Sequence, residues 1–486
     1  MKFGHQTIIN GFGLIMLISC IQLTIIAIKS EPPKQQLSYS EVRHELQTLR
    51  QHVTQFSAVA AQNPAQFDAF SRQLELIDTQ HRNGMSTKIL ASQIAKALAY
   101  LDDASATISP ISSRFTLPIN LRAIDSDWLA LDEQGNPIDT DAAFLTHIDG
   151  LPISRWVTAS QQFLPPSLRE RTSLQIQWLK RLSVLRAEIG IEDKPQVRLT
   201  LSDKGELTTQ VILSLTPETP MILQARREQD NFENSPLGII NVNNLNAFEP
   251  NSPLANNLRR AILSPITILD LRYGYGDSDN LLSFLNHYYG YQYQAYQPYG
   301  RQTDLLSPDW QTSSIYAVAR YKRHANIRAD YLQSMHYTPY DQLSNQAQLE
   351  LQQATNLVTN RDDKLFSQWH GKRLAIAPAP AMILPQPTPG KLVLIIGPQC
   401  KHACQWIAHF AKGWPNTVLI GEATLGNVDK HQRIKLPISG INVRVTSTQA
   451  FDAMGQQLSG VGTQPDIEQP LEETVYWKGI AELIQM

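Results

Sequence analysis

Cysteine is scarce in this sequence, which has only three in 486 residues. Cys20 lies in an apolar N-terminal segment, which leaves Cys400 and Cys404 as a candidate pair. An oxidising compartment permits a disulfide between them. Residues four apart on a regular helix, however, have Cβ atoms about 5–6 Å apart, wider than the ~3.8 Å of a disulfide. A bridge therefore requires Cys400 to lie before a helix; otherwise both are small buried thiols.

An excess of either charge is also missing. Lys and Arg together number 42 and Asp and Glu number 44, so the formal net charge is −2. Nothing in this balance indicates an electrostatic nucleic-acid partner. Hydrophobic residues make up 42% and charged residues 18%, which is typical of a globular protein, and the length suffices for two or three domains.

Charge is entirely absent from Thr7–Ile28, near the N-terminus. The segment is long enough to span a bilayer, and it is placed like a secretory signal. Leu17–Cys20 resembles a lipoprotein cleavage box, but the apolar run continues to Ile28, which favours an uncleaved anchor. Residues 1–30 are therefore interpreted as a signal peptide or membrane anchor, with a lipoprotein as the alternative. Each interpretation places the bulk of the protein outside the cytoplasm.

The chain is organised around the stretch from Lys391 to Asn427. It opens with the apolar run KLVLIIG, typical of a strand buried on both faces of a parallel sheet. Apolar residues then recur at helical spacing from Ala403 to Trp414, and TVLIG predicts a second buried strand. Strand, turn, helix and strand form one βαβ unit of about 30 residues. The turn at Cys400–Cys404 lies at the carboxyl end of the first strand, where ligands and reactive groups gather in open α/β sheets.

This unit resembles the tail-specific (carboxyl-terminal-processing) serine protease family, on its tricorn-like branch. The family pattern has a Ser-Ala-x-Glu turn, a helix, and a Gly-Glu-x-Thr-x-Gly turn. The second turn stands here as Gly421–Gly426, a close match, whereas the first stands as His402-Ala403-Cys404-Gln405. His402 thus occupies the nucleophile position and Gln405 the Glu position. The resemblance implies the family's crotonase-like α/β fold but not its catalytic residues.

The remaining catalytic positions of the family are also changed. The resemblance places Ser105 at the position of the catalytic His, and Ser459 at that of the Glu that orients the apparatus. A Lys that serves as base in the other version of the family corresponds to Asn427. Nucleophilic catalysis needs a nucleophile, a base and an orienting group, and neither version is complete. Two arrangements could still provide catalytic activity. One is an exchanged Ser105–His402 dyad, and the other is Cys404 as a thiol nucleophile with His402 as its base.

An oxyanion turn of the family has a partial counterpart in the run from Asp270 to Asp277. The family pattern is Asp-Leu-Arg-x-Asn-x-Gly-Gly; Asp270, Arg272 and Gly276 match, while Gly274 and Asp277 depart. The resemblance assigns Gly276, Asp277 and Ala403 to oxyanion stabilisation or substrate binding. A carboxylate at 277 would oppose a developing oxyanion. The simpler interpretation of Asp270 and Arg272 is a structural ion pair at a strand end.

The predicted architecture is α/β: a tail-specific protease sheet domain with an N-terminal helical cap and a PDZ-like β subdomain. The helical domain spans residues 38–110, with breaks at Asn63-Pro64 and Asn83-Gly84. The PDZ-like domain spans 115–220, where the family resemblance rests on Asp149-Gly150, and the sequence predicts a helix over Leu174–Ile189. The protease domain spans 233–486. Within it, residues 291–389 are predicted to be an insertion that adds no new sheet. The Tyr-rich start of this insertion is expected to pack on the sheet or to touch a partner. Two strands, Ile434–Leu436 and Ile441–Val445, and a terminal helix are predicted to follow.

These observations predict an exported, membrane-tethered or periplasmic protein that is catalytically degenerate and binds an extended polypeptide or an envelope protein. The N-terminal segment supplies the membrane contact, and no cofactor, metal or nucleic acid is expected. Two alternatives stay open. One is an active serine- or cysteine-type peptidase with displaced residues, and the other is a scaffold whose cleft is empty. The geometry that separates them is whether Ser105, Gly276, His402 and Ser459 converge on one cleft.

Overall fold

The computed structural model describes residues 32–217, 239–290, 311–319, 338–339, 345, 368–376 and 390–469, with short gaps at 112, 125–126, 133–134, 206, 279, 415, 429–430, 447 and 452–457. Within these parts of the chain, no helix combines the length and apolar character needed to cross a bilayer. The candidate anchor Thr7–Ile28 and the expected terminal helix both lie outside the described residues.

The N-terminal part is helical, as the apolar periodicity predicts. It contains α2 (Tyr39–Phe56), α3 (Ala58–Gln62), α4 (Pro64–Gln80) and α5 (Thr87–Ala99), with a short ribbon of β1 (Gln36–Leu37) and β2 (Met85–Ser86). Ser38 and Glu41 form a capping box at the start of α2, which satisfies N–H groups that a helix start leaves open. Both predicted breaks fall between helices.

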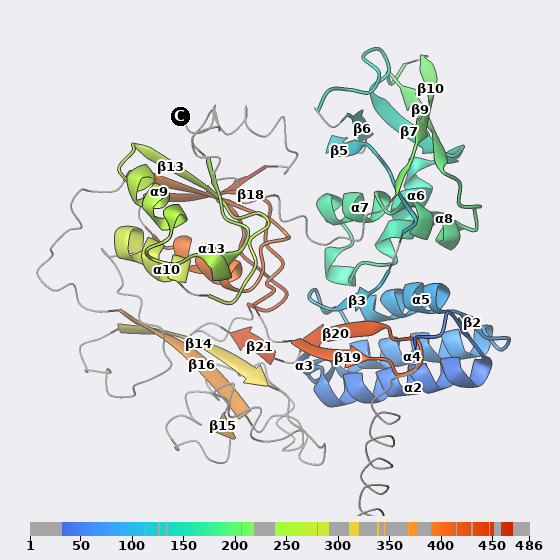
Figure 1. Cartoon of the computed structure of the whole chain (residues 1–486), viewed down its shortest axis with the longest axis horizontal. Coiled ribbons are helices and arrows are strands. Elements are labelled where there is room, and N and C mark those ends of the chain that lie inside the picture. The colour runs from blue at the N-terminus through green and yellow to red at the C-terminus, as the bar shows by residue number, and fades with distance from the viewer. Residues whose placement is uncertain are drawn as a thin grey trace, which may run out of the picture.

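The helical layer is completed by strands from the other end of the chain. β19 (His431–Lys435) and β20 (Asn442–Thr446) pair with each other and with β3 (Thr107–Ser109) in a three-stranded antiparallel sheet. Ile434, Val443 and Val445 share one hydrophobic core with α2, α4 and α5, and Figure 1 shows the strands lying along these helices. The interval predicted for the helical domain, 38–110, did not anticipate this contribution.

Residues 115–217 form a separate β and helix module. Its antiparallel sheet has the order β10-β9-β7-β6-β5, with β8 paired to β7; the strands are β5 (Asn120–Ile124), β6 (Asp127–Leu131), β7 (Phe144–Ile148), β8 (Leu151–Pro152), β9 (Gln196–Ser202) and β10 (Thr208–Ser214). Helices α6 (Ile153–Gln161), α7 (Thr172–Leu179) and α8 (Leu182–Ile189) and the short η1 (Pro166–Leu168) pack with it. The predicted Leu174–Ile189 helix is thus two helices. A two-stranded ribbon of β4 (Phe115–Thr116) and β11 (Thr216–Pro217) closes the module.

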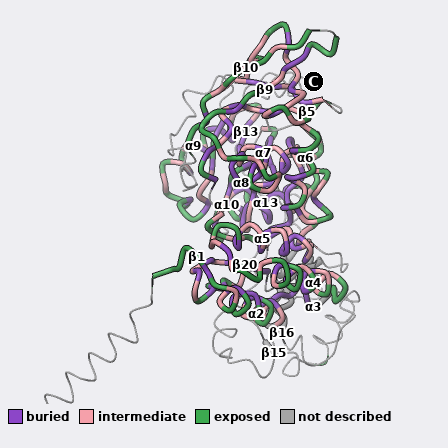
Figure 2. Tube along the Cα trace, turned by 90° about the vertical axis from the view of Figure 1, so that its right-hand side faces the viewer, coloured by how far each residue is buried: buried purple, intermediate pink, exposed green. Residues whose placement is uncertain are grey.

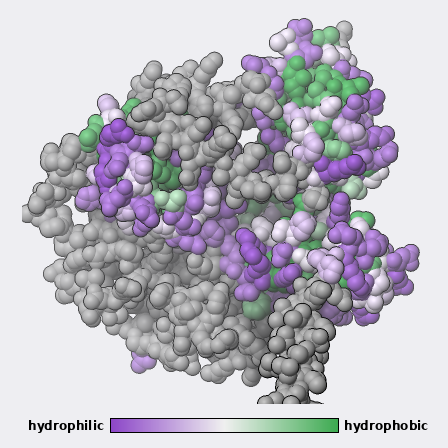
Figure 3. Space-filling view, in the orientation of Figure 1, coloured by the Kyte–Doolittle hydropathy of each residue, from purple (hydrophilic) through white to green (hydrophobic). Residues whose placement is uncertain are grey.

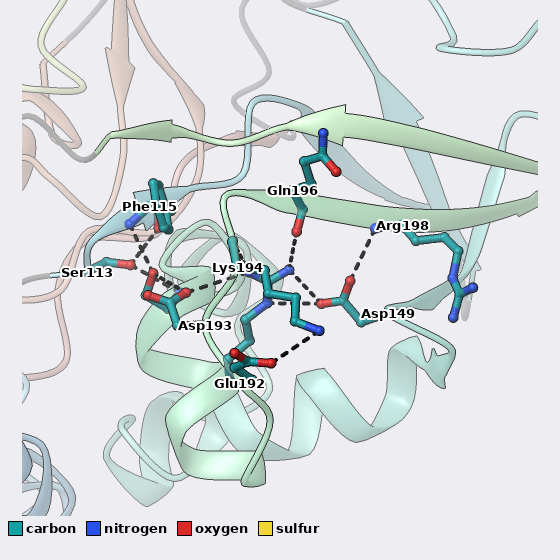
Figure 4. Close-up of polar contacts among 10 residues, drawn as sticks. Ser113, Phe115, Asp149, Glu192, Asp193, Lys194, Gln196 and Arg198 are labelled. Carbon is teal, nitrogen blue, oxygen red and sulfur yellow. Dashed lines mark hydrogen bonds and ion pairs between the residues drawn. The ribbon is translucent and has the colours of Figure 1, made fainter.

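Asp149-Gly150 forms the turn between β7 and β8, with φ of 50° and 79°, the left-handed conformation that two-residue hairpins favour. The buried Arg186 on α8 fixes this turn. Its guanidinium donates to Oδ2 of Asp149 and to the carbonyl oxygens of Lys194 and Gln196 (Figure 4). Figure 3 shows a patch of hydrophobic surface on this module. Ile124 and Ile212 of the module are exposed.

The buried apolar runs form one parallel sheet, as predicted. Its order is β12-β13-β17-β18-β22, from β12 (Ile239–Asn241), β13 (Ile266–Asp270), β17 (Lys391–Ile396), β18 (Thr417–Gly421) and β22 (Ile467–Glu468). Ile268 pairs with Val393 and Leu269 with Leu394, so β13 and β17 are direct neighbours. Helices α9 (Pro253–Ile262), α10 (Asn280–Leu285) and α13 (Ala403–Ala411), with η2 (Leu245–Ala247) and η3 (Asn286–Gly290), supply the main core on one face, and Figure 2 shows this region as buried.

The prediction that residues 291–389 add no new sheet is wrong. β14 (Gln311–Ala319), β15 (Thr338–Pro339) and β16 (Gln368–Ile376) form a four-stranded antiparallel sheet with β21 (Thr448–Phe451), in the order β15-β16-β14-β21. One of the two partners of β14, the strand β21, comes from outside the interval, and no local pattern reveals such a long-range partner. Of the stretch Tyr340–Thr359, whose sequence also favours a helix, only residue 345 is among the described residues.

Candidate functional site

A disulfide closes the turn between β17 and α13. Cys400 and Cys404 are bonded, with Cα atoms 5.4 Å apart, and both are fully buried. Because α13 begins at Ala403, Cys400 lies before the helix, which meets the condition that the sequence set for a bridge. Cys404 packs against Gly274, where an added Cβ would lie 3.0 Å from its sulfur. The departure from the family's Asn at position 274 therefore has a steric reason, and the bonded Cys404 is no thiol nucleophile.

His402 occupies the bend that enters α13. Its φ of +54° lies in a region that residues other than glycine rarely adopt, and its backbone N–H donates to the carbonyl oxygen of Asn427 at 2.7 Å. Its ring lies beside two titratable groups. Nδ1 is 3.8 Å from Oδ1 of Asp277, and the ring centroid is 5.5 Å from that of His431. An imidazole in this position can hold a proton or bind an anion, but it cannot act as an acyl-accepting hydroxyl.

His431 stands in a positively charged environment. Burial lowers the pKa of His431 to about 4; the charges of His402, Arg444 and Lys401 add to this, and Asp277 opposes it. Burial, with the neighbouring Arg444, also lowers the pKa of Lys401. His431 is therefore uncharged at neutral pH.

The turn that carries Gly276 closes onto α13 through its carbonyl group. The N–H of Ala403 donates to the Gly276 carbonyl oxygen at 2.9 Å. The backbone N–H groups of Asp277 and Ser278 both donate to Oδ1 of Asn246, at 2.9 and 3.0 Å. Oxyanion stabilisation requires donors aimed at the site of developing charge, and two of the donors at the assigned positions, Ala403 and Asp277, already have protein acceptors.

Ser105 is buried in a turn, as the sequence indicates, and its N–H donates to Oδ1 of Asp103. The Asp103 carboxylate also accepts from the backbone and hydroxyl of Thr446, at 2.9 and 2.6 Å. Burial raises the pKa of Asp103, which these hydrogen bonds oppose. Thr446 pairs with His431 across the sheet, so Ser105 reaches the surroundings of His402 only through these intermediates.

Ser459 and Asn427 lie on two loops that touch. The N–H of Gly460 donates to the carbonyl oxygen of Gly426 at 3.2 Å. The side-chain Oδ1 of Asn427 is buried and has no hydrogen-bond partner in the described part of the chain. Contacts thus bring Gly276, Asp277, Ala403, His402 and Asn427 together directly, and they join the loop of Ser459 to that of Asn427, whereas Ser105 is linked to His402 only through intermediate residues. Among the described residues, no His, Cys, Asp and Glu cluster is arranged to hold a metal ion.

Gln405 ties together the turns at this edge of the sheet. It is buried; its Nε2 donates to the Cys400 carbonyl oxygen at 2.6 Å, and its Oε1 accepts from Thr424 at 2.6 Å. Thr424 Oγ1 in turn accepts from the N–H of Thr463. Gln405 thus needs both a donor and an acceptor, and an ionised Glu has only acceptors.

Gln405→Glu is expected to lower the free energy of unfolding by about 1–3 kcal/mol at neutral pH, because a carboxylate oxygen would face the Cys400 carbonyl. Protonation restores the donor, so the folded-state pKa of the new Glu would be raised. The deficit should therefore be smallest at acidic pH and grow as pH rises. Urea unfolding of variant and wild type at each pH measures it. Gln399→Glu, at a partly exposed residue, is the control, and a deficit independent of pH would contradict the explanation.

A cavity of about 850 Å³ lies between the module and the carboxyl ends of the parallel strands; it is lined by residues of the neighbouring turns, such as Tyr273 and Ala423, and not by His402 or Gly276 themselves. Tyr273, Gln399 and Glu422 line it from the ends of β13, β17 and β18, and β5 and α7 line it from the module. Arg171, at the start of α7, donates to the carbonyl oxygens of Ala423 and Thr424 and so joins the two walls. Burial lowers the pKa of Arg171, and Glu422 and Glu468 oppose this.

Two residues of this region were not found from the sequence. His431 follows the Gly421–Gly426 turn closely, but a single His at a strand start carries no signal of its role. Arg171 lies in a helix of another part of the chain, and only the folded structure places it on the turn. By contrast, Asp270 and Arg272 form the buried ion pair that the sequence indicates, with Nη2 of Arg272 2.6 Å from Oδ2 of Asp270.

Comparison with known proteins gives a family match over part of the chain and a likeness in fold. The model of "Peptidase family S41" matches residues 267–469. No curated protein matches the sequence. Among solved structures, mature CPAF aligns with a TM-score of 0.58 at 13% identity, covering 92% of this chain and 96% of that one. Mature CPAF complexed with lactacystin aligns with a TM-score of 0.54 at 12% identity, covering 92% and 97%. At these identities the structural likeness concerns the fold alone.

Proposed function

We propose that this chain, whose residues 267–469 match peptidase family S41, the tail-specific proteases, binds extended polypeptide without cleaving it. The observation that carries the proposal is the state of the turn at α13. The nucleophile position holds His402, and the N–H that follows it, on Ala403, donates to the Gly276 carbonyl oxygen. The site therefore has no hydroxyl nucleophile at this position, and the N–H of Ala403 is not available to stabilise an oxyanion.

The other catalytic positions support the same conclusion. Ser105 and Ser459 stand where the family has its base and its orienting acid, and Asn427 cannot take a proton as a Lys does. Asp277 places a carboxylate beside His402, where negative charge opposes an oxyanion. Cys404 is bonded to Cys400, which weakens the alternative of a thiol peptidase, because the nucleophile must be a thiolate.

The binding part of the proposal rests on the cavity beside this turn. Its walls combine strand ends with the edge strand β5 and carry acidic, basic and amide groups, including Glu170, Lys180 and Gln177. A cleft of about 850 Å³ is large enough for several residues of an extended chain, since binding pockets of roughly 300–1,000 Å³ bury most of a drug-sized ligand. The partner would be an unfolded or extended segment, for example of an envelope protein.

Export forms the last part of the proposal. The uncharged segment Thr7–Ile28 is the sequence feature that supports it. The Cys400–Cys404 disulfide adds independent support, since disulfides persist in oxidising compartments such as the bacterial periplasm and are rare in the cytosol. We propose that this segment exports the protein and tethers it to the membrane.

Purified protein is expected to leave a denatured polypeptide uncut and to remain unlabelled by a fluorophosphonate probe. Loss of a triad member alone costs roughly 10⁴-fold or more in rate. Fluorescence anisotropy should show that a labelled extended peptide binds. Gel analysis of wild type and His402→Ala, with and without a thiol reagent, measures cleavage. Cleavage by wild type that His402→Ala abolishes would establish an active peptidase with relocated chemistry.

A further inference from the structure

The outer face of the sheet β19-β20-β3 carries a dense set of basic side chains. Along β19, His431, Arg433 and Lys435 alternate with Gln432 and Ile434. Since Ile434 belongs to the core beneath, the alternation directs the basic residues to the opposite face. Arg444 of β20 is directly opposite Arg433 and so shares their face. We call Arg433, Lys435 and Arg444 the basic face; His431, which is uncharged at neutral pH, lies at its edge.

No negative charge within the sheet balances these residues. β19, β20 and β3 contain no Asp or Glu. In the described part of the chain, Arg433, Lys435 and Arg444 form no ion pair, and all three are exposed. Like charges directly opposite across a sheet destabilise it, which applies to Arg433 and Arg444. The whole chain is slightly acidic, with a net charge of −2, so this accumulation is local.

The basic face continues into the former catalytic turn. His431 stacks edge-on against His402, with ring centroids 5.5 Å apart. Lys401, the residue before it, is partly buried, has no carboxylate partner among the described residues, and feels the charge of Arg444. Asn427, whose backbone accepts from His402, has its buried side-chain oxygen unpaired. Asp277 is the one acidic group that the described contacts bring to His402 and His431.

From this charge pattern we infer that the polypeptide bound by this protein is acidic, and that the basic face receives its carboxylates next to His402. The inference rests on the proposed function and names the chemistry of its ligand. Arginine matches carboxylate geometry with paired N–H donors. A carboxylate between Arg433 and Arg444 would remove their repulsion, and one beside Lys401 would supply the charge that its site lacks. The cavity at the module then holds a neighbouring part of the same extended chain.

The test compares two labelled extended peptides, one rich in Glu and a twin with every Glu replaced by Gln. At low salt, wild type should bind the acidic peptide about tenfold tighter or more, since each charge contact with an exposed residue adds a modest increment. The preference should shrink at high salt, where exposed charges are screened. Arg433→Gln/Arg444→Gln should remove it. Lys88→Gln/Arg155→Gln removes the same charge from exposed positions on α5 and α6 and should leave it intact.

The outcomes separate the two proposals. Equal binding of both peptides to wild type would overturn the inference and leave the proposed function standing. Failure of both peptides to bind would overturn the proposed function, and this inference with it. Co-sedimentation with vesicles of phosphatidylglycerol and phosphatidylcholine that is lost in Arg433→Gln/Arg444→Gln, without any preference between the peptides, would assign the basic face to a membrane instead and also overturn the inference.

Discussion

Replacing Arg186 by Met is expected to lower the free energy of unfolding by about 3–5 kcal/mol, the usual result of breaking a buried ion pair from one side. The side chain of Arg186 is 1% exposed, and its guanidinium donates to Asp149 and to the carbonyl oxygens of Lys194 and Gln196. Met fills much of the volume but donates nothing. The Asp149 carboxylate would then keep only the backbone N–H of Arg198 among these partners.

Arg198→Met is the matched control, because it makes the same substitution in the same network at an exposed side chain. Arg198 contacts Asp149 through its backbone N–H, which the substitution retains. Its cost should stay within about 0.5 kcal/mol, as for most surface changes. Urea unfolding followed by circular dichroism measures both variants. Equal losses in Arg186→Met and Arg198→Met would contradict the role assigned to the buried guanidinium.

Arg272→Met is expected to have an effect of similar size, about 3–5 kcal/mol, for a charge buried at the carboxyl end of β13. Nε and Nη2 of Arg272 donate three hydrogen bonds to the carboxylate of Asp270, at 2.6 to 3.1 Å, and both residues are buried. Without them, Asp270 retains the backbone N–H of residue 272, which does not offset the burial of a full negative charge.

The double variant Asp270→Asn/Arg272→Met provides the decisive comparison. It removes the unpaired negative charge of the buried Asp270 carboxylate, so the double variant should be more stable than Arg272→Met alone even though it carries one more substitution. Chemical denaturation of wild type, both single variants and the double variant completes the cycle. Additive losses would show that the two side chains do not act as a pair. Because Arg272 also lines the cavity beside the module, peptide binding should be measured on the same variants.

The parallel sheet could be predicted because its information is local. KLVLIIG and TVLIG are long enough and apolar enough to specify strands buried on both faces, and the residues of α13 repeat at helical spacing. The ion pair of Asp270 and Arg272 was predictable for the same reason, since two residues separated by one position at a strand end reach each other without help from the rest of the fold.

The sequence predicted which residues form the candidate site, but not the hydrogen bond that joins its two turns. The matched turns indicated that Gly276 and His402 would approach each other. The hydrogen bond from the N–H of Ala403 to the Gly276 carbonyl oxygen depends on the positive φ of His402. A positive φ is rare for residues other than glycine, so a His at this position does not indicate it. Likewise Ile434 and Val443 indicated strands, but β3, the second partner of the strand that carries Val443, lies more than 300 residues earlier in the chain, and such pairings leave no local signal.

The joining of the two ends of the chain in one small core has a consequence for biosynthesis. The Glu45 carboxylate accepts from the backbone N–H of Ser439, 394 residues further along, so β19 and β20, which cover α2, α4 and α5, leave the ribosome long after these helices. The apolar faces of the first helices therefore stay exposed to solvent until most of the polypeptide has been made. Any shortened product that ends before residue 431 would lack the lid of its own N-terminal layer. A chain that includes these strands can bury the apolar faces of its first helices, whereas a shorter chain leaves them exposed to proteases.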